Sequence, residues 1–355
     1  MENIALVVGA TGITGSNLAQ ELISEGWTTY GLARNPNSNI KGLIPVKADL
    51  LDEENLTEAL QNISPTHLFF TTWMRNDTEE ENIKINSALV RNLLKILSQK
   101  KSVQHVGLVT GLKHYLGPFE TYAKEGSMPE TPLREEQPRL KYPNFYYAQE
   151  DAVYEAAERD NFTWSIHRPH TVIGYAVGNL MNLGTTLAIY ASICKETGRK
   201  FIFPGSSAQW NGLSDVTDAR ILAKQLIWAS TNEAAKNQAF NITNGDVFRW
   251  KWLWEKIADY FQIEFEGFEN EIRPLEKELQ NDHTLWEEIT EKYDLKENNL
   301  AKISSAWHTD LDLGRPIEVM TDMAKSRKLG FTTFQSTLDS FTDLFEKLKE
   351  EKLIP

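Results

Sequence analysis

The sequence holds a single cysteine, Cys194, among 355 residues, so no disulfide can form within the chain. Its seven histidines show no metal-ligand spacing and no His or Cys cluster, so we expect no metal. No apolar run approaches membrane-spanning length. The N-terminus enters a strand-like run directly, without the basic segment of a signal peptide. Together these absences predict a cytoplasmic protein without disulfide, metal or membrane segment.

Positive charge is also in short supply. The chain has 37 Lys and Arg against 50 Asp and Glu, a formal net charge of -13. Nucleic acids and anionic membranes attract proteins with a positive field, so we expect neither as a partner. A local basic pocket for a phosphate stays compatible with this charge. The content of 41% hydrophobic and 25% charged residues is that of an ordinary globular protein with a large core.

Strand-like and helix-like patterns alternate in the N-terminal half. Short apolar runs are typical of strands buried on both faces of a parallel sheet, and they lie at 4–8, 28–33, 43–46, 66–71 and 103–109. Helical periodicity lies between them, at 17–25, 53–61 and 80–99. The alternation predicts an α/β fold, a Rossmann-type doubly wound parallel sheet.

The C-terminal half has mainly helical patterns, at 181–195, 219–230, 249–261 and 338–352. We expect a dinucleotide-binding Rossmann domain at 1–170 and a smaller substrate-binding lobe at 171–355. Parts of the second region should return to the Rossmann domain, so the two are interleaved. The long helices leave a homodimer open as an alternative to a monomer.

A glycine pattern stands between the first predicted strand and the first predicted helix: Gly9-Ala10-Thr11-Gly12-Ile13-Thr14-Gly15. Gly9 permits a tight turn, Gly12 lets the backbone approach a pyrophosphate, and Gly15 allows close helix–strand packing. The helix N-terminus then offers free N–H groups to phosphates. The G-x-x-G-x-x-G spacing resembles the extended and atypical short-chain dehydrogenases. The predicted cofactor contacts are Gly9, Thr11, Gly12, Ile13 and Gly15.

The second predicted strand ends in Arg34, where NAD enzymes usually place an Asp or Glu for the ribose diol. A guanidinium there can pair with the 2′-phosphate of NADP, which predicts NADPH as the cofactor. Asp49 and Leu50 resemble the adenine-contacting pair of the superfamily. Thr71 ends the fourth predicted strand, where a loop would pass under the cofactor.

The usual catalytic Tyr-x-x-x-Lys of short-chain dehydrogenases is absent, because Glu150 and Asp151 follow Tyr146 and Tyr147 at that spacing. A lysine stands instead after the fifth predicted strand, in Thr110-Gly111-Leu112-Lys113-His114-Tyr115. This motif and Asn144-Phe145-Tyr146-Tyr147-Ala148-Gln149-Glu150-Asp151 resemble those of the progesterone 5β-reductase/iridoid synthase family. Further similar stretches make the resemblance cover nearly the whole chain.

The resemblance implies that Tyr146 is the catalytic tyrosine and Lys113 its displaced lysine, both also near the cofactor with Thr110. It implies NADPH-dependent reduction of the C=C bond of a small-molecule enone or enal. Hydride addition to the β-carbon makes an enolate, and a phenol hydrogen bond stabilises the developing charge. Tyr147 is an alternative for the catalytic role, although packing suits it better.

Four residues are candidates for lining a substrate pocket: Trp73, Phe119, Met181 and Trp307. Two other functions stay open. One is a carbonyl reductase or sugar-nucleotide epimerase of the extended type, against which the absent Tyr-x-x-x-Lys counts. The other is a non-catalytic NADPH-binding sensor, against which the presence of both Tyr146 and Lys113 counts. Neither the physiological substrate nor the product's stereochemistry follows from these residues, because substrate choice depends on pocket loops.

Overall fold

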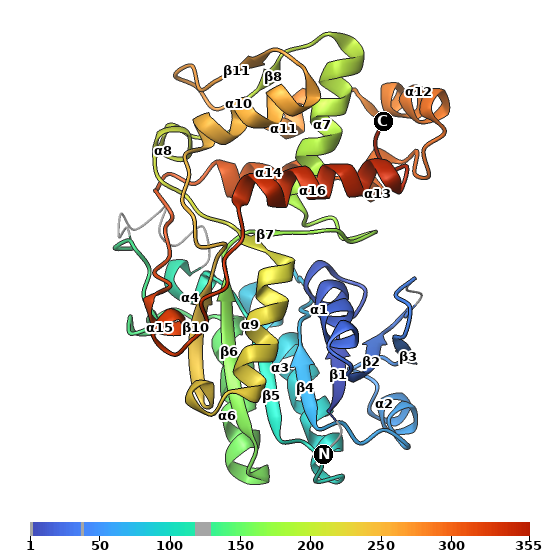
Figure 1. Cartoon of the computed structure of the whole chain (residues 1–355), viewed down its shortest axis with the longest axis vertical. Coiled ribbons are helices and arrows are strands. Elements are labelled where there is room, and N and C mark those ends of the chain that lie inside the picture. The colour runs from blue at the N-terminus through green and yellow to red at the C-terminus, as the bar shows by residue number, and fades with distance from the viewer. Residues whose placement is uncertain (1–2, 37–38, 118–128) are drawn as a thin grey trace. The chain divides into compact units, whose positions relative to one another are not determined.

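The computed structural model describes residues 3–36, 39–117 and 129–355. Its chain divides into two compact units, whose elements are labelled in Figure 1. Unit 1 consists of Met1–His170, Ala219–Ile242 and Asp322–Thr333. Unit 2 consists of Thr171–Asp218, Thr243–Thr321 and Phe334–Pro355. The chain therefore leaves unit 1 at residue 170 and returns to it twice.

Unit 1 is built on a seven-stranded sheet with the order β10-β6-β5-β4-β1-β2-β3. Every neighbouring pair in it is parallel. The strands are β1 Ile4–Val8, β2 Thr28–Ala33, β3 Ile44–Lys47, β4 His67–Phe70, β5 His105–Val109, β6 Thr163–Pro169 and β10 Gln238–Ile242. The predicted Rossmann-type α/β class is confirmed. In such sheets the chain order reverses at the centre, here between β1 and β4, and ligands bind beyond the carboxyl ends of the strands.

Helices cover both faces of this sheet. They are α1 Ile13–Ser24, α2 Glu53–Ala59, α3 Glu79–Ser98, α4 Lys113–Leu116, α6 Phe145–Asp160, α9 Ala219–Thr231 and α15 Ala324–Lys328, with a 3₁₀ helix at Glu233–Ala235. Helices α3 and α6 pack together on one face, and α1 and α9 pack together on the other (Figure 1). Alternate strand residues such as Leu6 and Val8 are buried against the α3–α6 layer. This double covering explains why the strands are apolar on both faces.

Two helix starts differ from the predictions. Helix α1 begins at Ile13 and not at residue 17, because the chain turns into the helix inside the glycine motif, directly after the extended Gly12. Helix α6 begins at Phe145 and not near residue 148. Asn144 caps it, its side-chain oxygen accepting from the Tyr146 N–H at 3.0 Å. Tyr146 therefore lies in the first turn of α6.

Unit 2 is mainly helical, as predicted. Its helices are α7 Leu183–Thr197, α8 Ser207–Asn211, α10 Trp250–Phe261, α11 Leu275–Glu278, α12 His283–Tyr293, α13 Leu300–Ile303, α14 Ala306–Leu313 and α16 Thr337–Glu350. Two small parallel pairs accompany them: β7 Val172–Ile173 with β9 Thr217–Asp218, and β8 Phe201–Ile202 with β11 Phe265–Glu266. Helix α7 is buried along most of its length, and Trp254 stacks on Phe201 with ring centroids 4.0 Å apart. Unit 2 thus has a hydrophobic core of its own.

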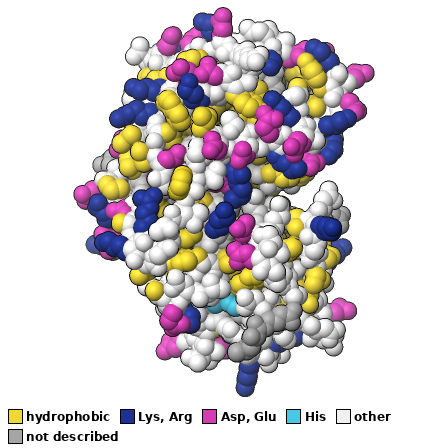
Figure 2. Space-filling view, viewed as in Figure 1, with side chains coloured by type: hydrophobic (Ala, Val, Ile, Leu, Met, Phe, Trp, Pro, Cys, Tyr) yellow, Lys and Arg dark blue, Asp and Glu magenta, His cyan; other side chains and the backbone are white. Residues whose placement is uncertain are grey.

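Charged side chains of both signs are interspersed over each unit on the face that Figure 2 shows. Among the residues that the structure describes, no helix has the length and apolar character needed to cross a membrane.

Candidate active site

The turn after β1 requires glycine at two positions. Gly9 has φ +83°, and a Cβ there would lie 2.7 Å from the Cβ of Thr72. A Cβ on Gly15 would lie 2.2 Å from the Gly9 carbonyl oxygen, closer than any real contact. The turn is therefore as tight as the sequence motif predicted, and only hydrogen atoms fit where side chains would stand.

The start of α1 is left open, unlike the starts of neighbouring helices. Gly12 offers no side-chain cap to α1, and the first turn contains no acidic residue. By contrast, Asp52 caps α2 and Thr78 caps α3, and acidic residues fill both first turns. The first N–H groups of α1 and its positive dipole end thus remain available to an anion. The Ile13 side chain is buried, so its contribution to such a site is its backbone N–H.

The residues predicted to contact the adenosine part of the cofactor have different environments. Arg34 directly follows β2 and is exposed, and the described part of the chain places no carboxylate within ion-pair distance of it. The Asp49 carboxylate accepts from the Leu51 N–H at 2.9 Å and so shapes its own loop. Leu50 is only 7% exposed and packs into the sheet core. An adenine contact by Leu50 would thus involve its backbone.

The loop after β4 is held in place by side chains. The Thr71 hydroxyl donates to the Val8 carbonyl at 2.7 Å, which ties the ends of β4 and β1 together beside the glycine turn. Buried Asn86 of α3 accepts from the Met74 N–H at 2.7 Å and donates to the Met74 carbonyl at 2.8 Å. Trp73, next to this anchor, stacks on Phe145 with centroids 5.2 Å apart. The loop therefore connects the glycine turn with the start of α6.

The two predicted catalytic residues lie in the first turns of α4 and α6, beyond the carboxyl end of β5. Lys113 opens α4, and its Nζ lies 4.9 Å from the ring centroid of Phe145. The Tyr146 hydroxyl would be 3.4 Å from a Cβ on Gly111, so it lies over the turn that leads into Lys113. The structure thus brings the Thr110–Lys113 turn and the Tyr146 phenol together. No hydrogen bond joins the Tyr146 hydroxyl to another of the described residues.

Asn144 connects these two segments directly. Its Oδ1 accepts from the Tyr146 N–H, and its Nδ2 donates to the Lys113 carbonyl at 2.7 Å. The side chain is only 4% exposed. One buried amide therefore fixes the backbones of both candidate catalytic residues. Asn144 was quoted in the sequence motif but given no role there, although an Asn before a helix is a known cap signal.

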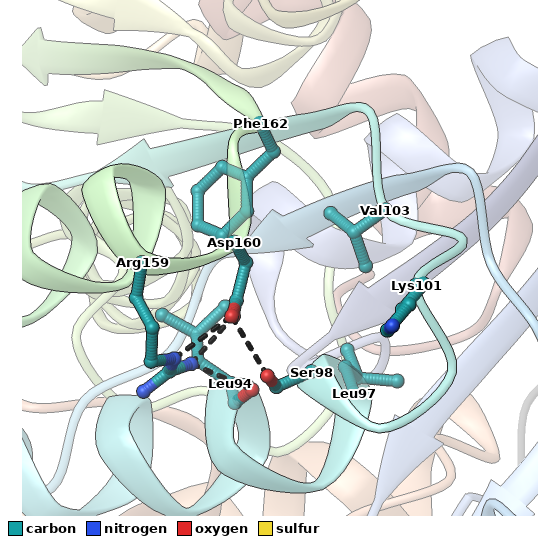
Figure 3. Close-up of a pocket in the computed structure, with 8 residues that line it drawn as sticks. All are labelled: Leu94, Leu97, Ser98, Lys101, Val103, Arg159, Asp160 and Phe162. Carbon is teal, nitrogen blue, oxygen red and sulfur yellow. Dashed lines mark hydrogen bonds and ion pairs between the residues drawn. The ribbon is translucent and has the colours of Figure 1, made fainter.

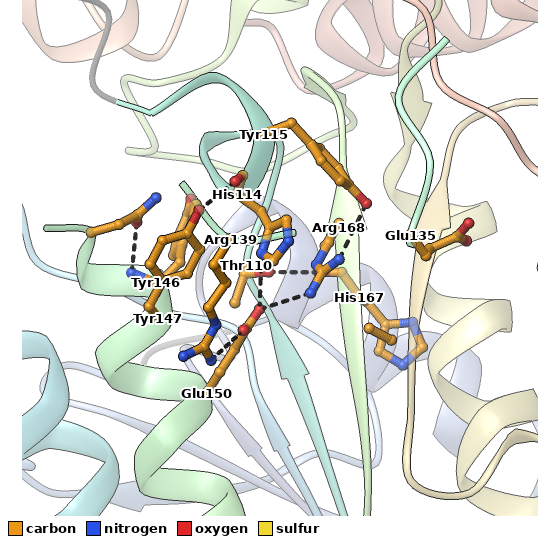
Figure 4. Close-up of polar contacts among 12 residues, drawn as sticks. Thr110, His114, Tyr115, Glu135, Arg139, Tyr146, Tyr147, Glu150, His167 and Arg168 are labelled. Carbon is orange, nitrogen blue, oxygen red and sulfur yellow. Dashed lines mark hydrogen bonds and ion pairs between the residues drawn. The ribbon is translucent and has the colours of Figure 1, made fainter. Parts of the chain in front are cut away.

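Glu150 occupies the position where a conventional short-chain dehydrogenase has its lysine. It is 1% exposed, and it accepts from Arg139 Nη2 at 2.8 Å and from Arg168 Nη2 at 3.3 Å (Figure 4). Its carboxylate also lies 3.7 Å from His114 Nδ1. Burial raises the pKa of Glu150, but His114, Arg168 and Arg139 together lower it more, so it falls below its usual value. Glu150 thus acts as an internal anion between α4, α6 and β6.

Tyr147 belongs to this internal network. Its hydroxyl donates to the His114 carbonyl at 2.5 Å and accepts from the Leu140 N–H at 3.0 Å, and Figure 4 shows it beside Arg139. The ring is 8% exposed. The Tyr147 hydroxyl already donates and accepts within the protein, which favours a structural role. The Tyr146 hydroxyl has no such hydrogen bond among the described residues, so it is the better candidate for binding a substrate.

Glu79 is a charged neighbour of the site that the sequence motifs did not reveal. It begins α3, and its Oε2 lies 3.7 Å from Lys113 Nζ. Burial raises the pKa of Tyr146, and the charge of Glu79 raises it further. Burial lowers the pKa of Lys113, and Glu79 opposes that change. Thr78 followed by acidic residues is a sequence signal for the start of a helix. Nothing near Glu79 in the sequence indicates that it lies at the site.

The other residues predicted to line the substrate pocket lie outside the described part of unit 1. Phe119 lies outside the described residues. Met181 and Trp307 belong to unit 2, where Met181 is 36% exposed just before α7 and Trp307 lies in the first turn of α14. The Ser305 N–H donates to Thr186 Oγ1 at 3.1 Å, which ties the start of α14 to the start of α7. Both candidates thus flank one end of α7, and their role in binding stays a prediction.

A hollow of about 220 Å³ lies elsewhere in unit 1, between α3 and α6 (Figure 3). Its lining consists of Leu94, Leu97, Ser98, Lys101, Val103, Arg159, Asp160 and Phe162. The Asp160 carboxylate there already accepts from Ser98 at 2.7 Å and from Arg159. The predicted site residues are not part of this lining, so the hollow belongs to the packing of the two helices.

Solved structures of the same fold include the UDP-glucose 4-epimerase of Thermotoga maritima, with a TM-score of 0.68 at 13% identity, covering 98% of this chain and 99% of that one. An identity this low shows the fold alone. The chain thus has a Rossmann-type α/β fold like that of the epimerase, a fold of the kind that binds a nucleotide cofactor.

The family follows from closer relatives. A model described as PRISE-like Rossmann-fold domain matches residues 42–355. The 3-oxo-Delta(4,5)-steroid 5-beta-reductase of Arabidopsis thaliana is 38% identical over 367 residues, covering 100% of this chain and 94% of that protein. The (S)-8-oxocitronellyl enol synthase of Catharanthus roseus is 36% identical over 366 residues, covering 100% and 93%. The chain is an enzyme of the PRISE family, the progesterone 5β-reductase/iridoid synthase-like family that its motifs resemble.

Proposed function

We propose that the protein is an NADPH-dependent reductase of the C=C bond in 2-enones or enals, with Tyr146 and Lys113 as its catalytic residues. The observation that carries the proposal is the joint anchoring of these two residues. Asn144 binds the backbone of both, while Glu150 takes the position of the conventional lysine. The Tyr146 hydroxyl has no hydrogen bond among the described residues, so it is free to donate to a substrate oxygen.

The residues of unit 1 fit a dinucleotide. Added Cβ atoms would fill the turn at Gly9 and Gly15, and the uncapped start of α1 presents N–H groups for a pyrophosphate. Exposed Arg34 suits the 2′-phosphate that distinguishes NADPH from NADH. Lys113 would bind the nicotinamide ribose hydroxyls. When bound, NADPH supplies the hydride.

The residue types suit conjugate reduction. Adding a hydride to the β-carbon of an enone moves negative charge onto the carbonyl oxygen. The Tyr146 phenol donates a hydrogen bond to that oxygen and stabilises the enolate as it develops. Burial and the Glu79 charge both raise the pKa of Tyr146, so the phenol keeps its proton at neutral pH. Solvent can protonate the α-carbon afterwards, so a second acid is not required.

The names of two relatives support this substrate class. One relative is a 3-oxo-Delta(4,5)-steroid 5-beta-reductase and the other an (S)-8-oxocitronellyl enol synthase. The first name describes reduction of a conjugated ketone, and the second describes formation of an enol. Both agree with hydride addition to the β-carbon of a C=C bond conjugated with a carbonyl, which leaves an enolate.

The test is NADPH oxidation with 2-cyclohexen-1-one, followed by chromatographic analysis of the product. We expect the saturated ketone from wild type, with kcat/KM lower by roughly 10²–10³-fold in Tyr146→Phe. Lys113→Met should raise KM for NADPH as well as lower kcat. Tyr147→Phe is the matched control: it removes a hydroxyl one residue along and should keep most activity while losing about 1–3 kcal/mol of stability. An allylic alcohol as product would favour carbonyl reduction, and tight NADPH binding without turnover of any enone or enal would favour a sensor.

A further inference from the structure

Glu79 lies between the two helices that carry the catalytic pair. Its Oε1 accepts from the Phe145 N–H at 2.8 Å, in the first turn of α6. Its Oε2 lies 3.7 Å from Lys113 Nζ, at the start of α4, and accepts from Asn82 Nδ2 at 3.3 Å. One carboxylate from α3 therefore contacts both the segment of Tyr146 and the side chain of Lys113.

The surroundings make this charge effective. The Glu79 side chain is 23% exposed and that of Lys113 35% exposed, so bulk water screens the pair only in part. Two charged groups act on the catalytic pair: Glu79 from α3 acts on both residues, and Arg75 from the loop after β4 acts on Lys113. The charges on the other side of α4 and α6 pair among themselves, namely Glu150 with Arg139, Arg168 and His114.

We propose that Glu79 is a positioning residue that holds the Lys113 side chain at the first turn of α6 and keeps Tyr146 a protonated hydrogen-bond donor, an inference that rests on the proposed enone reduction. A lone ammonium beside a phenol favours the phenolate, as in enzymes whose tyrosine acts as a base. The Glu79 carboxylate, bound to the first turn of α6 and near the Lys113 ammonium, acts in the opposite direction: it raises the pKa of the phenol and favours the charged ammonium.

This arrangement matters for the direction of the chemistry. A protonated phenol donates to an oxygen that becomes negative, whereas a phenolate would repel it. Burial and Glu79 both raise the pKa of Tyr146, and Glu79 opposes the lowering by burial of the pKa of Lys113. Glu79 thus favours the phenol–ammonium pair that reduction needs over the phenolate that alcohol oxidation or epimerisation needs.

The test is a spectrophotometric tyrosinate titration from about pH 8 to about pH 12, without substrate or cofactor, because burial and Glu79 raise the pKa of Tyr146 above its usual value of about 10. Glu79→Gln keeps an oxygen for the Phe145 N–H but removes the charge, and Glu79→Asp keeps the charge. Each variant is compared with the same protein carrying Tyr146→Phe, so that the difference isolates Tyr146. We expect roughly tenfold more Tyr146 phenolate in Glu79→Gln than in wild type at the same pH. Glu79→Asp and the matched control Glu80→Gln, on the same exposed turn, should behave as wild type.

The kinetic counterpart is the pH profile of kcat/KM for enone reduction. Its alkaline limb should move to lower pH in Glu79→Gln and stay in place in Glu79→Asp. The proposal would be overturned if wild type and Glu79→Gln gave the same titration curve. It would also be overturned if Glu79→Gln and Glu79→Asp lost the same activity while the alkaline limb of the pH profile stayed in place. Glu79→Asn repeats the titration if the Gln variant does not fold. A wild type that reduces no enone would refute the proposed function alone, because the titration needs no turnover and still decides the role of Glu79.

Discussion

Lys113 and His114 are neighbours on α4, and Tyr146 and Tyr147 are neighbours on α6, yet each pair divides between two environments. Lys113 and Tyr146, with Glu79, form what we name the Tyr146 cluster. In it the phenol hydroxyl has no hydrogen bond among the described residues, and the lysine has one long ion pair. Its polar groups thus retain unused hydrogen-bonding capacity.

The second environment, named the Tyr147 cluster, consists of Tyr147, His114, Glu150, Arg139 and Arg168. Here the tyrosine hydroxyl both donates and accepts, and the carboxylate is shared by two guanidinium groups. The buried carboxylate and Arg168 are 1% and 4% exposed. The difference teaches that the same two motifs supply the proposed reactive groups on one side and, on the other, a buried polar network that holds their helices in place.

The largest effect should come from removing the buried carboxylate of the Tyr147 cluster. Glu150→Ala leaves Arg168 buried without its carboxylate, and we expect a loss of about 3–5 kcal/mol in the free energy of unfolding. Asp151→Ala is the matched control, because Asp151 also pairs with Arg139, at 2.7 Å, but its side chain is 48% exposed. It should cost less than about 1 kcal/mol. Urea unfolding measures both, and equal losses would contradict the assigned role of Glu150.

A middle-sized effect should come from the link between the two motifs. Asn144→Asp keeps an oxygen for the Tyr146 N–H but cannot donate to the Lys113 carbonyl. We expect kcat to fall roughly tenfold, since a small displacement of a catalytic group is costly. Asn144→Ala loses both hydrogen bonds. Its free energy of unfolding should be ~1 kcal/mol lower than that of Asn144→Asp, because the helix cap is lost. Steady-state kinetics and thermal unfolding check these outcomes, and an Asp variant with normal kcat would show that Asn144 supports only the fold.

The smallest effect should be a pH dependence of the free energy of unfolding that comes from the Tyr147 cluster. Burial lowers the pKa of His114, and its partners hold the pKa of Glu150 below the usual value. In both cases the unfolded chain takes up a proton at a higher pH than the folded protein does. The stability of the Tyr147 cluster should therefore be complete near neutral pH and fall as the pH drops below about 6.5 and then towards 4. Urea unfolding at several pH values should give a flatter dependence in Glu150→Ala below about pH 4.5, the range in which the Glu150 carboxylate titrates in the unfolded chain; an equal slope there would place the acid sensitivity elsewhere.

Local patterns were enough to predict much of the fold. The strand segments, the glycine turn and the separation of Tyr146 from a conventional lysine all follow from residues close in sequence. The start of α6 was missed by about three residues although its cap, Asn144, is a local signal; only the hydrogen bond from the Asn144 side chain to the Lys113 carbonyl depends on the tertiary structure. The sequence motifs contained both tyrosines, but only hydrogen-bond partners distinguish the packed Tyr147 from Tyr146.

By itself the sequence determined the fold class and the segments that carry the site, because hydrophobic periodicity and glycine sterics act over a few residues. Only the tertiary structure decided which charges meet there. Glu79 and Phe145 are 66 positions apart, and they come together because α3 and α6 pack on one face of the sheet. Electrostatic effects act through space and not along the chain, so the partner of Lys113 could not be read from its neighbours in sequence.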